Sequence, residues 1–178
     1  MPTSSPPPLP LDAAGLLPES AWDALQPARS YLVFAQLRDA SLDASGWARH
    51  AKQFFRAELQ LTRPKAYGES PPKKDAAHLL LTRPPLPNAL RSVFLRPRTE
   101  EDLACAESAQ GGGGLALLAK RCTMVVLVGL PEGADEDEPT LFVAAVIAGV
   151  VLGPILTPDR RSIYGVKTAR GMLEPMVG

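Results

Sequence analysis

The side chains that could bind a metal or act as a soft nucleophile are few and far apart in the sequence. Cys105 and Cys122 have sixteen residues between them, and the only histidines are His50 and His78. Structural zinc usually needs four ligands at close spacing, and the chain has no CxxC or HxxxH pair. We therefore predict no metal site and no cofactor, and leave open whether the two thiols lie close together.

No pattern typical of covalent catalysis occurs in the chain. A GxSxG sequence is absent, neither cysteine has a histidine nearby in the sequence, and no pair of carboxylates stands apart from the others. Asp75 and His78 are close in sequence and could line a pocket at a sheet edge. Catalytic groups assemble in space, so an enzyme stays an alternative, but we expect a protein without catalysis.

Four consecutive glycines at 111–114 could in principle hold a phosphate, because glycine amides that lead into a helix can bind an anion. A P-loop needs GxxxxGK followed by Ser or Thr after a strand. Here a predicted helix precedes the glycines, and Lys120 follows the last of them by six residues. We interpret the run as a linker between two helices and leave ligand binding there open.

Charge is distributed unevenly along a chain whose formal net charge is zero. Residues 49–98 contain eleven Lys and Arg against three acids, and residues 99–139 contain nine acids against two basic residues. If these segments stay apart in space, complementary potentials could orient a charged partner. The candidate partner-binding residues are a basic ridge of Arg49, Lys52, Arg56, Lys73 and Lys74, and an acidic loop of Asp135, Glu136, Asp137 and Glu138.

The acidic loop has oxygen ligands but lacks the alternating DxDxDG order of a calcium loop, so we interpret it as the solvated tip of a hairpin. The basic ridge suggests a nucleic-acid-binding module, with phosphate contacts from the ridge and stacking from Phe54, Phe55 or Tyr67. Our leading hypothesis is a different one. We predict a non-catalytic accessory or adaptor protein that self-associates or docks on a larger protein through apolar and charge-segregated surfaces.

The elements that must position these residues follow from hydrophobic patterning. Apolar runs predict strands over 30–39, 78–84, 91–97 and 123–130. Helical spacing predicts helices over 18–26, 41–61, 111–122 and 165–176. Ser45 is the expected N-cap of the second of these helices, and Thr99 with Asp102 predicts the start of a further helix over 99–110.

The most apolar segment, LFVAAVIAGVVLGPIL at 141–156, either crosses a membrane or fills a core. As a helix it would reach about 24 Å, against a hydrocarbon thickness of about 30 Å. Gly149 and Gly153 form a GxxxG that favours a membrane-anchored protein, whereas Pro154 opposes a continuous span. We prefer a buried segment, either a helix or a strand that pairs with 123–130 as a hairpin.

Together these elements predict a single α+β domain over 18–178, with a mixed or antiparallel sheet of about five to six strands covered by helices. The first seventeen residues, which begin MPTSSPPPLP, are too rich in proline for regular structure and are expected to form a flexible tail. This start lacks the basic and apolar regions of a secretory signal. We therefore expect a cytoplasmic protein with reduced thiols and without a membrane anchor.

Overall fold

The computed structural model describes residues 29–36, 42–61, 76–131 and 133–177. The predictions for the tail over 1–17, the first helix over 18–26, Tyr67, Lys73, Lys74 and Asp75 therefore lie outside the described residues.

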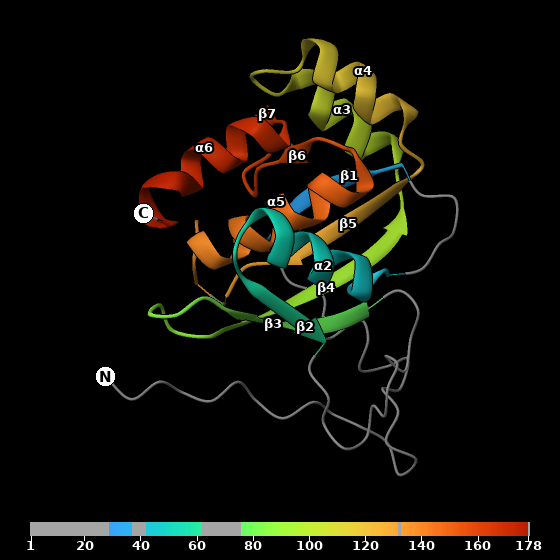
Figure 1. Cartoon of the computed structure of the whole chain (residues 1–178). Helices are drawn as coiled ribbons and strands as arrows, with labels where there is room; N and C mark the ends of the chain where they lie inside the picture. Colours follow the sequence, from blue (N-terminus) through green and yellow to red (C-terminus); the bar gives the residue numbers. More distant parts are fainter. Residues whose placement is uncertain (1–28, 37–41, 62–75, 132, 178) are drawn as a thin grey trace.

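The described residues form an α+β fold around one antiparallel sheet, as predicted (Figure 1). The strands are β1 (Ser30–Ala35), β2 (Glu58–Leu61), β3 (Ala76–Thr82), β4 (Ala89–Pro97), β5 (Met124–Gly129), β6 (Ile155–Leu156) and β7 (Ile163–Tyr164). Their order in the sheet is β2-β3-β4-β5-β1-β6-β7. The sheet thus has seven strands where we expected five to six, because the two-residue strands β6 and β7 are too short to give a sequence pattern and β2 lies in a segment that we predicted as helix.

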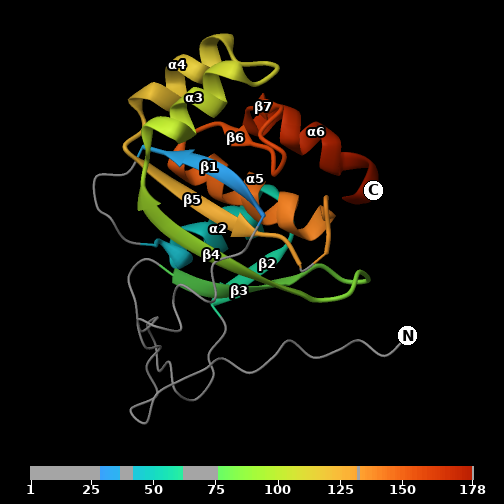
Figure 2. The same cartoon turned by 180° about the vertical axis from the view of Figure 1, so that it is seen from behind.

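Helices cover both faces of the central strands. They are α2 (Ala44–Phe54), α3 (Glu100–Ser108), α4 (Gly113–Arg121), α5 (Glu138–Val151) and α6 (Val166–Val177). In Figure 1, α2, α5 and α6 lie in front of the sheet, and Figure 2 shows α3 and α4 at one end of the opposite face.

The two central strands are buried on both faces, as their continuous apolar sequences predicted. Successive residues of β1 alternate between two cores: Val33 packs with α2, α5 and α6, whereas Leu32 and Phe34 pack with α3 and α4. Strand β3, by contrast, buries Leu79 and Leu81 and leaves His78 and Leu80 half-buried. The strands at the centre of the sheet are therefore covered on both faces, whereas β3 is fully buried on one face.

The prediction of a hairpin between 123–130 and the following apolar run is wrong. The run forms α5, a helix whose Asp137 side chain caps the Thr140 amide, with Pro139 in the first turn. We read its Val and Ile content as strand, but α5 is buried on nearly every side between the sheet, α2 and α6, where a helix can be hydrophobic all round. The other alternative, a strand followed by a buried helix, is the correct one.

The apolar segment at 141–156 is also not one element. Helix α5 ends at Val151, Leu152 takes a left-handed conformation with φ 56°, and Ile155–Leu156 form β6 beside β1. Gly153 is required at this turn, because a Cβ there would lie 1.6 Å from the Phe34 carbonyl oxygen. None of the helices in the described part of the chain has the length and apolar character that crossing a bilayer requires.

The helix predicted over 41–61 is shorter than expected. Its N-cap is Asp43, whose side chain accepts a hydrogen bond from the Gly46 amide, and not Ser45. The helix ends at Phe54, and Arg56 has a φ of 51°, which turns the chain into β2. Apolar residues continued at helical spacing through Leu59, which is in fact buried by alternation along β2.

The start of α3 is confirmed in detail. Thr99 and Asp102 form a capping box, in which each side chain accepts a hydrogen bond from the other residue's backbone amide. The glycine run links α3 to α4, as predicted, and Gly112 is the N-cap of α4. Gly111 has a φ of 89° and packs against the Ile163 carbonyl, so this run brings the helical pair close to β7.

Candidate functional site

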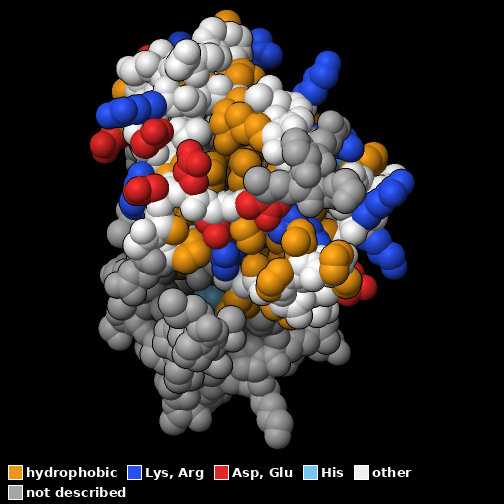
Figure 3. Space-filling model, turned by 90° about the vertical axis from the view of Figure 1, so that its left-hand side faces the viewer, with side chains coloured by type: hydrophobic (Ala, Val, Ile, Leu, Met, Phe, Trp, Pro, Cys, Tyr) orange, Lys and Arg blue, Asp and Glu red, His pale blue; other side chains and the backbone are white. Residues whose placement is uncertain are grey.

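A groove of about 950 Å³ lies where the start of β1, the acidic loop, the β6–β7 turn and α6 meet. We call it the acidic groove, because five carboxylate side chains and one arginine line it. Its acidic side chains are Asp135, Glu136, Asp137, Glu138 and Asp159. The face in Figure 3 shows acidic side chains gathered beside a hollow with hydrophobic side chains at its centre.

Two of these acids are tied to the sheet by arginines. Glu138 accepts two hydrogen bonds of 2.5 Å from Arg83 at the end of β3, and this arginine is only 9% exposed. Asp137 accepts bonds of 2.9 Å and 2.7 Å from Arg91 on β4 and also caps α5. Both acids therefore hold the first turn of α5 against the sheet.

These contacts contradict the assumption that the basic segment 49–98 and the acidic segment 99–139 are separated in space. The basic and acidic segments do not stay apart, since Arg83 and Arg91 come from the first and their acidic partners from the second. A third ion pair, between Arg96 and Asp102, also joins the two segments. The sequence alone does not show these ion pairs, because their members are far apart in the chain. The pairs of Arg83 and Arg91 form where the β3–β4 pair passes beside the start of α5.

Two acids of the groove remain without an ion pair to any described side chain. Glu136 is exposed, and Asp159 is exposed and accepts hydrogen bonds from the Thr157 hydroxyl and the Arg161 amide. Asp135, in contrast, pairs with Arg29. With respect to the described part of the chain, the groove therefore keeps two negative charges that have no ion pair.

Tyr31 and Tyr164 line the same groove as these charges. Burial raises the pKa of Tyr31 to about 12, and the negative charges of Glu136 and Asp137 add to the shift. Burial also raises the pKa of Tyr164, with further contributions from Tyr31 and Glu136. Both rings are neutral at pH 7. Tyr31 is buried at 5% exposure, whereas Tyr164 is half-buried and presents aromatic surface near these acids.

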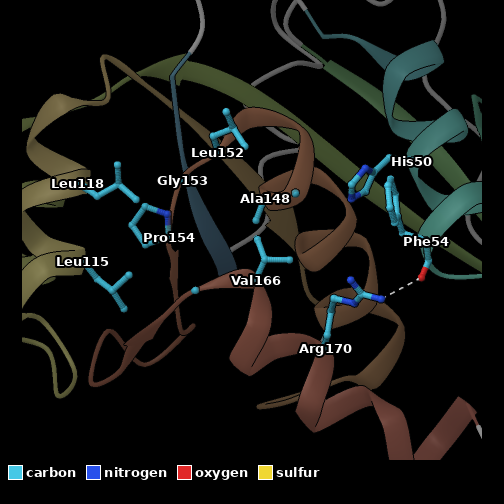
Figure 4. A pocket seen from close by; sticks show the side chains of 12 residues that line it. His50, Phe54, Leu115, Leu118, Ala148, Leu152, Gly153, Pro154, Val166 and Arg170 are labelled. Carbon is cyan, nitrogen blue, oxygen red and sulfur yellow. Dashed lines mark hydrogen bonds between the residues drawn. The ribbon is translucent and has the colours of Figure 1, made fainter.

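A second recess of about 410 Å³ lies on the other side of α6 (Figure 4). We call it the apolar pocket. Leu115 and Leu118 of α4 form one side, His50 and Phe54 of α2 the opposite side, and Arg170 of α6 the lower edge. The end of α5 and the turn after it add Ala148, Gly149, Leu152, Gly153 and Pro154, and the start of α6 completes the lining with Gly165 and Val166.

His50 is held in this pocket by close packing. Its ring centroid lies 4.6 Å from that of Phe54, and a Cβ on Gly149 would lie 2.3 Å from its Nε2 atom. Burial lowers the pKa of His50, and the positive charge of Arg170 lowers it further. The imidazole is therefore neutral at pH 7, and Gly149 serves helix packing here.

The basic ridge is only partly described. Arg49 and Lys52 are exposed on α2, and Arg56 is exposed beyond the end of that helix. Of the proposed stacking groups, Phe55 is buried and Phe54 lines the apolar pocket. Nucleic-acid binding stays a prediction.

The remaining candidate residues do not meet at either recess. His78 shares a 3.0 Å hydrogen bond with the Ser92 hydroxyl, and burial lowers its pKa. Cys105 and Cys122 are both free thiols, and burial raises the pKa of Cys122 to about 11. Among the described residues, no group of three His, Cys, Asp or Glu side chains could hold a metal ion.

The sequence identified the acidic wall of the groove but not its other walls. Tyr31 was read only as a strand residue, and Tyr164, Asp159 and Arg170 were not singled out. Tyr164 belongs to the two-residue strand β7 and Asp159 to the turn before it, neither of which carries a pattern, and Arg170 lies on a helix far from His50 in sequence. Comparisons with protein-family models, with curated proteins and with solved structures gave no match.

Proposed function

We propose that this protein is a non-catalytic adaptor that binds a basic, partly apolar segment of a larger protein in the acidic groove. The observation that carries the proposal is the position of Glu136, an unpaired carboxylate among the described residues, beside two neutral tyrosines in the groove.

The chemistry of the groove suits a lysine or arginine side chain. A cation above an aromatic ring is attracted by the ring's quadrupole, and a carboxylate nearby can accept a charge-assisted hydrogen bond. Tyr164 and Glu136 supply both kinds of contact within one recess, which the buried Tyr31 also lines. Asp159 adds a second negative charge at the β6–β7 turn.

The apolar part of the groove suits the rest of such a segment. Leu141, Ile163, Met172 and Leu173 line it together with the acids, and Met172 is 47% exposed. Ile163 and Leu173 are already buried, but a partner that brought only charge would leave Met172 and the half-buried Leu141 in contact with water, whereas a segment that alternates basic and apolar residues would cover them. This supports a protein segment as the ligand.

The test is a titration of the full chain into a fluorescein-labelled peptide of alternating arginine and leucine, followed by fluorescence anisotropy. We expect saturable binding that weakens as salt rises, because exposed charges are screened. A glutamate–leucine peptide serves as the control ligand and should not bind.

Two charge reversals locate the site. Glu136→Lys should weaken binding of the basic peptide by about tenfold. Glu107→Lys reverses an exposed acid on α3 that does not line the groove, and should have little effect. Equal losses in the two variants would show a general charge effect and reject the groove. Light scattering at low and high salt shows whether the occupant is a second copy of the chain, which would also reject a separate partner.

A further inference from the structure

We infer that the apolar pocket is a second ligand site, which binds a small monocarboxylate with an apolar body and places its carboxylate on Arg170. The site is independent of the acidic groove, because α6 separates the two recesses. Val166 and Arg170 line the pocket, whereas Thr168 and Met172 line the groove. In a helix, residues four apart share one face, which explains this division.

The size and lining of the pocket fit a small ligand. Its volume of about 410 Å³ lies within the range of roughly 300–1,000 Å³ that is usual for small-molecule sites. Such sites are mostly apolar and contain a few polar groups that orient the ligand. Arg170 and His50 are the two polar side chains here, and the other side chains that line the pocket are hydrophobic.

The pocket is open to solvent at its rim. Leu152 is 65% exposed and Phe54 is 46% exposed, and both line the pocket. Exposed side chains of this size, gathered around a recess, are the usual mark of a binding surface. Leu152 also keeps a left-handed backbone conformation that a leucine rarely adopts. An apolar ligand body would cover both side chains.

The positive charge of the Arg170 guanidinium favours an anionic ligand. It donates one hydrogen bond of 3.3 Å to the Phe54 carbonyl and lies 5.3 Å from the centre of the Phe55 ring. These contacts hold its plane at the edge of the pocket, as Figure 4 shows. Arg170 forms no ion pair with a described side chain, and a guanidinium has five N–H donors that suit a carboxylate.

A single positive charge favours a monoanion. A phosphate monoester would bring close to two negative charges into a largely apolar pocket, where Arg170 is the one arginine among the described lining residues that can balance them. The neutral His50 adds a hydrogen-bonding group but no second positive charge. A carboxylate on an aliphatic or aromatic body is thus the ligand class that matches both parts of the pocket.

The test uses decanoate as the probe, with decanol and decylamine as neutral and cationic analogues. Isothermal titration of the full chain should give one saturable decanoate site below the concentration at which the probe self-associates. Decanol should bind about tenfold more weakly and decylamine more weakly still, since they lack the contact with Arg170. Amide NMR shifts caused by decanoate should centre on 148–154 and on Val166.

Two variants separate the parts of the pocket. Arg170→Gln should abolish the preference for decanoate over decanol, while Lys167→Gln, on an exposed face of the same helix, should preserve it. Leu152→Gly removes an apolar wall and relaxes the left-handed backbone, so it should weaken decanoate and decanol alike without loss of folding. Leu117→Ala removes an equally exposed leucine that does not line the pocket, and should weaken neither.

Three results would overturn the inference: absence of saturable binding, equal affinity for decanoate and decanol, or a preference that survives Arg170→Gln. Glu136→Lys distinguishes this inference from the proposed function, because it should weaken the basic peptide and leave decanoate unaffected.

Discussion

The acidic groove and the apolar pocket share α6 as a wall, but their charged side chains differ in sign, in number and in how many form ion pairs. Among the residues that the structure describes, arginines neutralise three of the five acids in the groove, and the two acids without an ion pair lie apart on the loop and on the β6–β7 turn. In the pocket a single arginine lies at the edge of hydrophobic walls. Dispersed surplus charge suits an extended partner, whereas one localised charge suits a small ligand. The number of charges in a recess therefore says less about its ligand than the number of charges left without an ion pair.

The walls of the two recesses are also held by different forces. Ion pairs fix the acidic segment to β3 and β4, so half of the conspicuous charge in this part of the sequence is structural. Glycines shape the pocket, where Gly149 admits the His50 ring and Gly153 admits the backbone of β1. Substitutions that break these ion pairs should therefore leave the apolar pocket intact, and substitutions of these glycines should leave the acidic groove intact.

The largest expected effect comes from Arg83→Met. The substitution leaves Glu138, which is 20% exposed, without its bidentate partner, and it removes a guanidinium that lies 4.2 Å from the centre of the Phe142 ring. Removal of one member of a buried ion pair costs about 3–5 kcal/mol. We expect a loss of about 3 kcal/mol in the free energy of unfolding, measured by urea denaturation.

The matched control is Asp135→Asn, which breaks the exposed pair between Asp135 and Arg29. The Asp135 side chain is 88% exposed, so we expect a change of at most about 1 kcal/mol. Equal changes in Arg83→Met and Asp135→Asn would mean that the groove is not held by buried charge, and the contrast between the two recesses would fail.

A smaller effect is expected from Gly149→Ala in the wall of the apolar pocket. The added methyl group would lie 2.3 Å from His50 Nε2, so the imidazole must move. Overpacking costs about 1–3 kcal/mol, and the better helix propensity of alanine returns close to 1 kcal/mol. We expect a net loss of about 1 kcal/mol, with a shift of the His50 ring signals in NMR spectra.

Gly171→Ala on α6 provides the comparison, because nothing lies within 4 Å of its added methyl group. It should stabilise the protein by up to about 1 kcal/mol through helix propensity alone. If Gly149→Ala were equally stabilising and left the His50 signals in place, glycine would not be what makes room for the imidazole.

Local signals predicted much of the fold. The capping box of Thr99 and Asp102, the apolar runs of β1 and β5, and the glycine linker were read correctly because each depends on neighbouring residues. Helix α5 was misread because valine and isoleucine favour strands on average. Burial on nearly every side of a helix reverses that preference, and only the tertiary structure shows the burial.

The candidate sites were less predictable, because they combine residues that are distant in sequence. The pocket joins His50 to Arg170, and the groove joins Tyr31 to Tyr164. The ion pairs of Arg83 and Arg91 depend on a β3–β4 pair that passes beside α5. Composition identified the acidic loop as a candidate but could not distinguish its paired acids from Glu136.

The smallest expected effect is a pH dependence that separates histidines from carboxylates. His50 has a pKa lowered by burial and then by Arg170, the charged side chain that α6 directs to it, while the α4 and α5 residues lining the pocket are uncharged. Burial also lowers the pKa of His78. Both groups bind protons more readily in the unfolded chain, whose histidines have a pKa near 6.5, so the free energy of unfolding should fall as pH falls below about 7.

Asp159 in the groove affects the free energy of unfolding in a different pH range. Hydrogen bonds from Thr157 and the Arg161 amide lower its pKa from the ordinary value of 3.8, so its contribution is present above pH 4 and is lost only as pH falls further. Urea denaturation at pH 7, 6, 5 and 4 should show a shallower slope for His50→Asn between pH 7 and 5, and an unchanged slope there for Asp159→Asn. An unchanged slope in His50→Asn would show that the imidazole titrates in the folded protein as it does in the unfolded chain. The apolar pocket would then gain positive charge in mild acid, and its anion affinity would rise in a pH range where the acidic groove does not change.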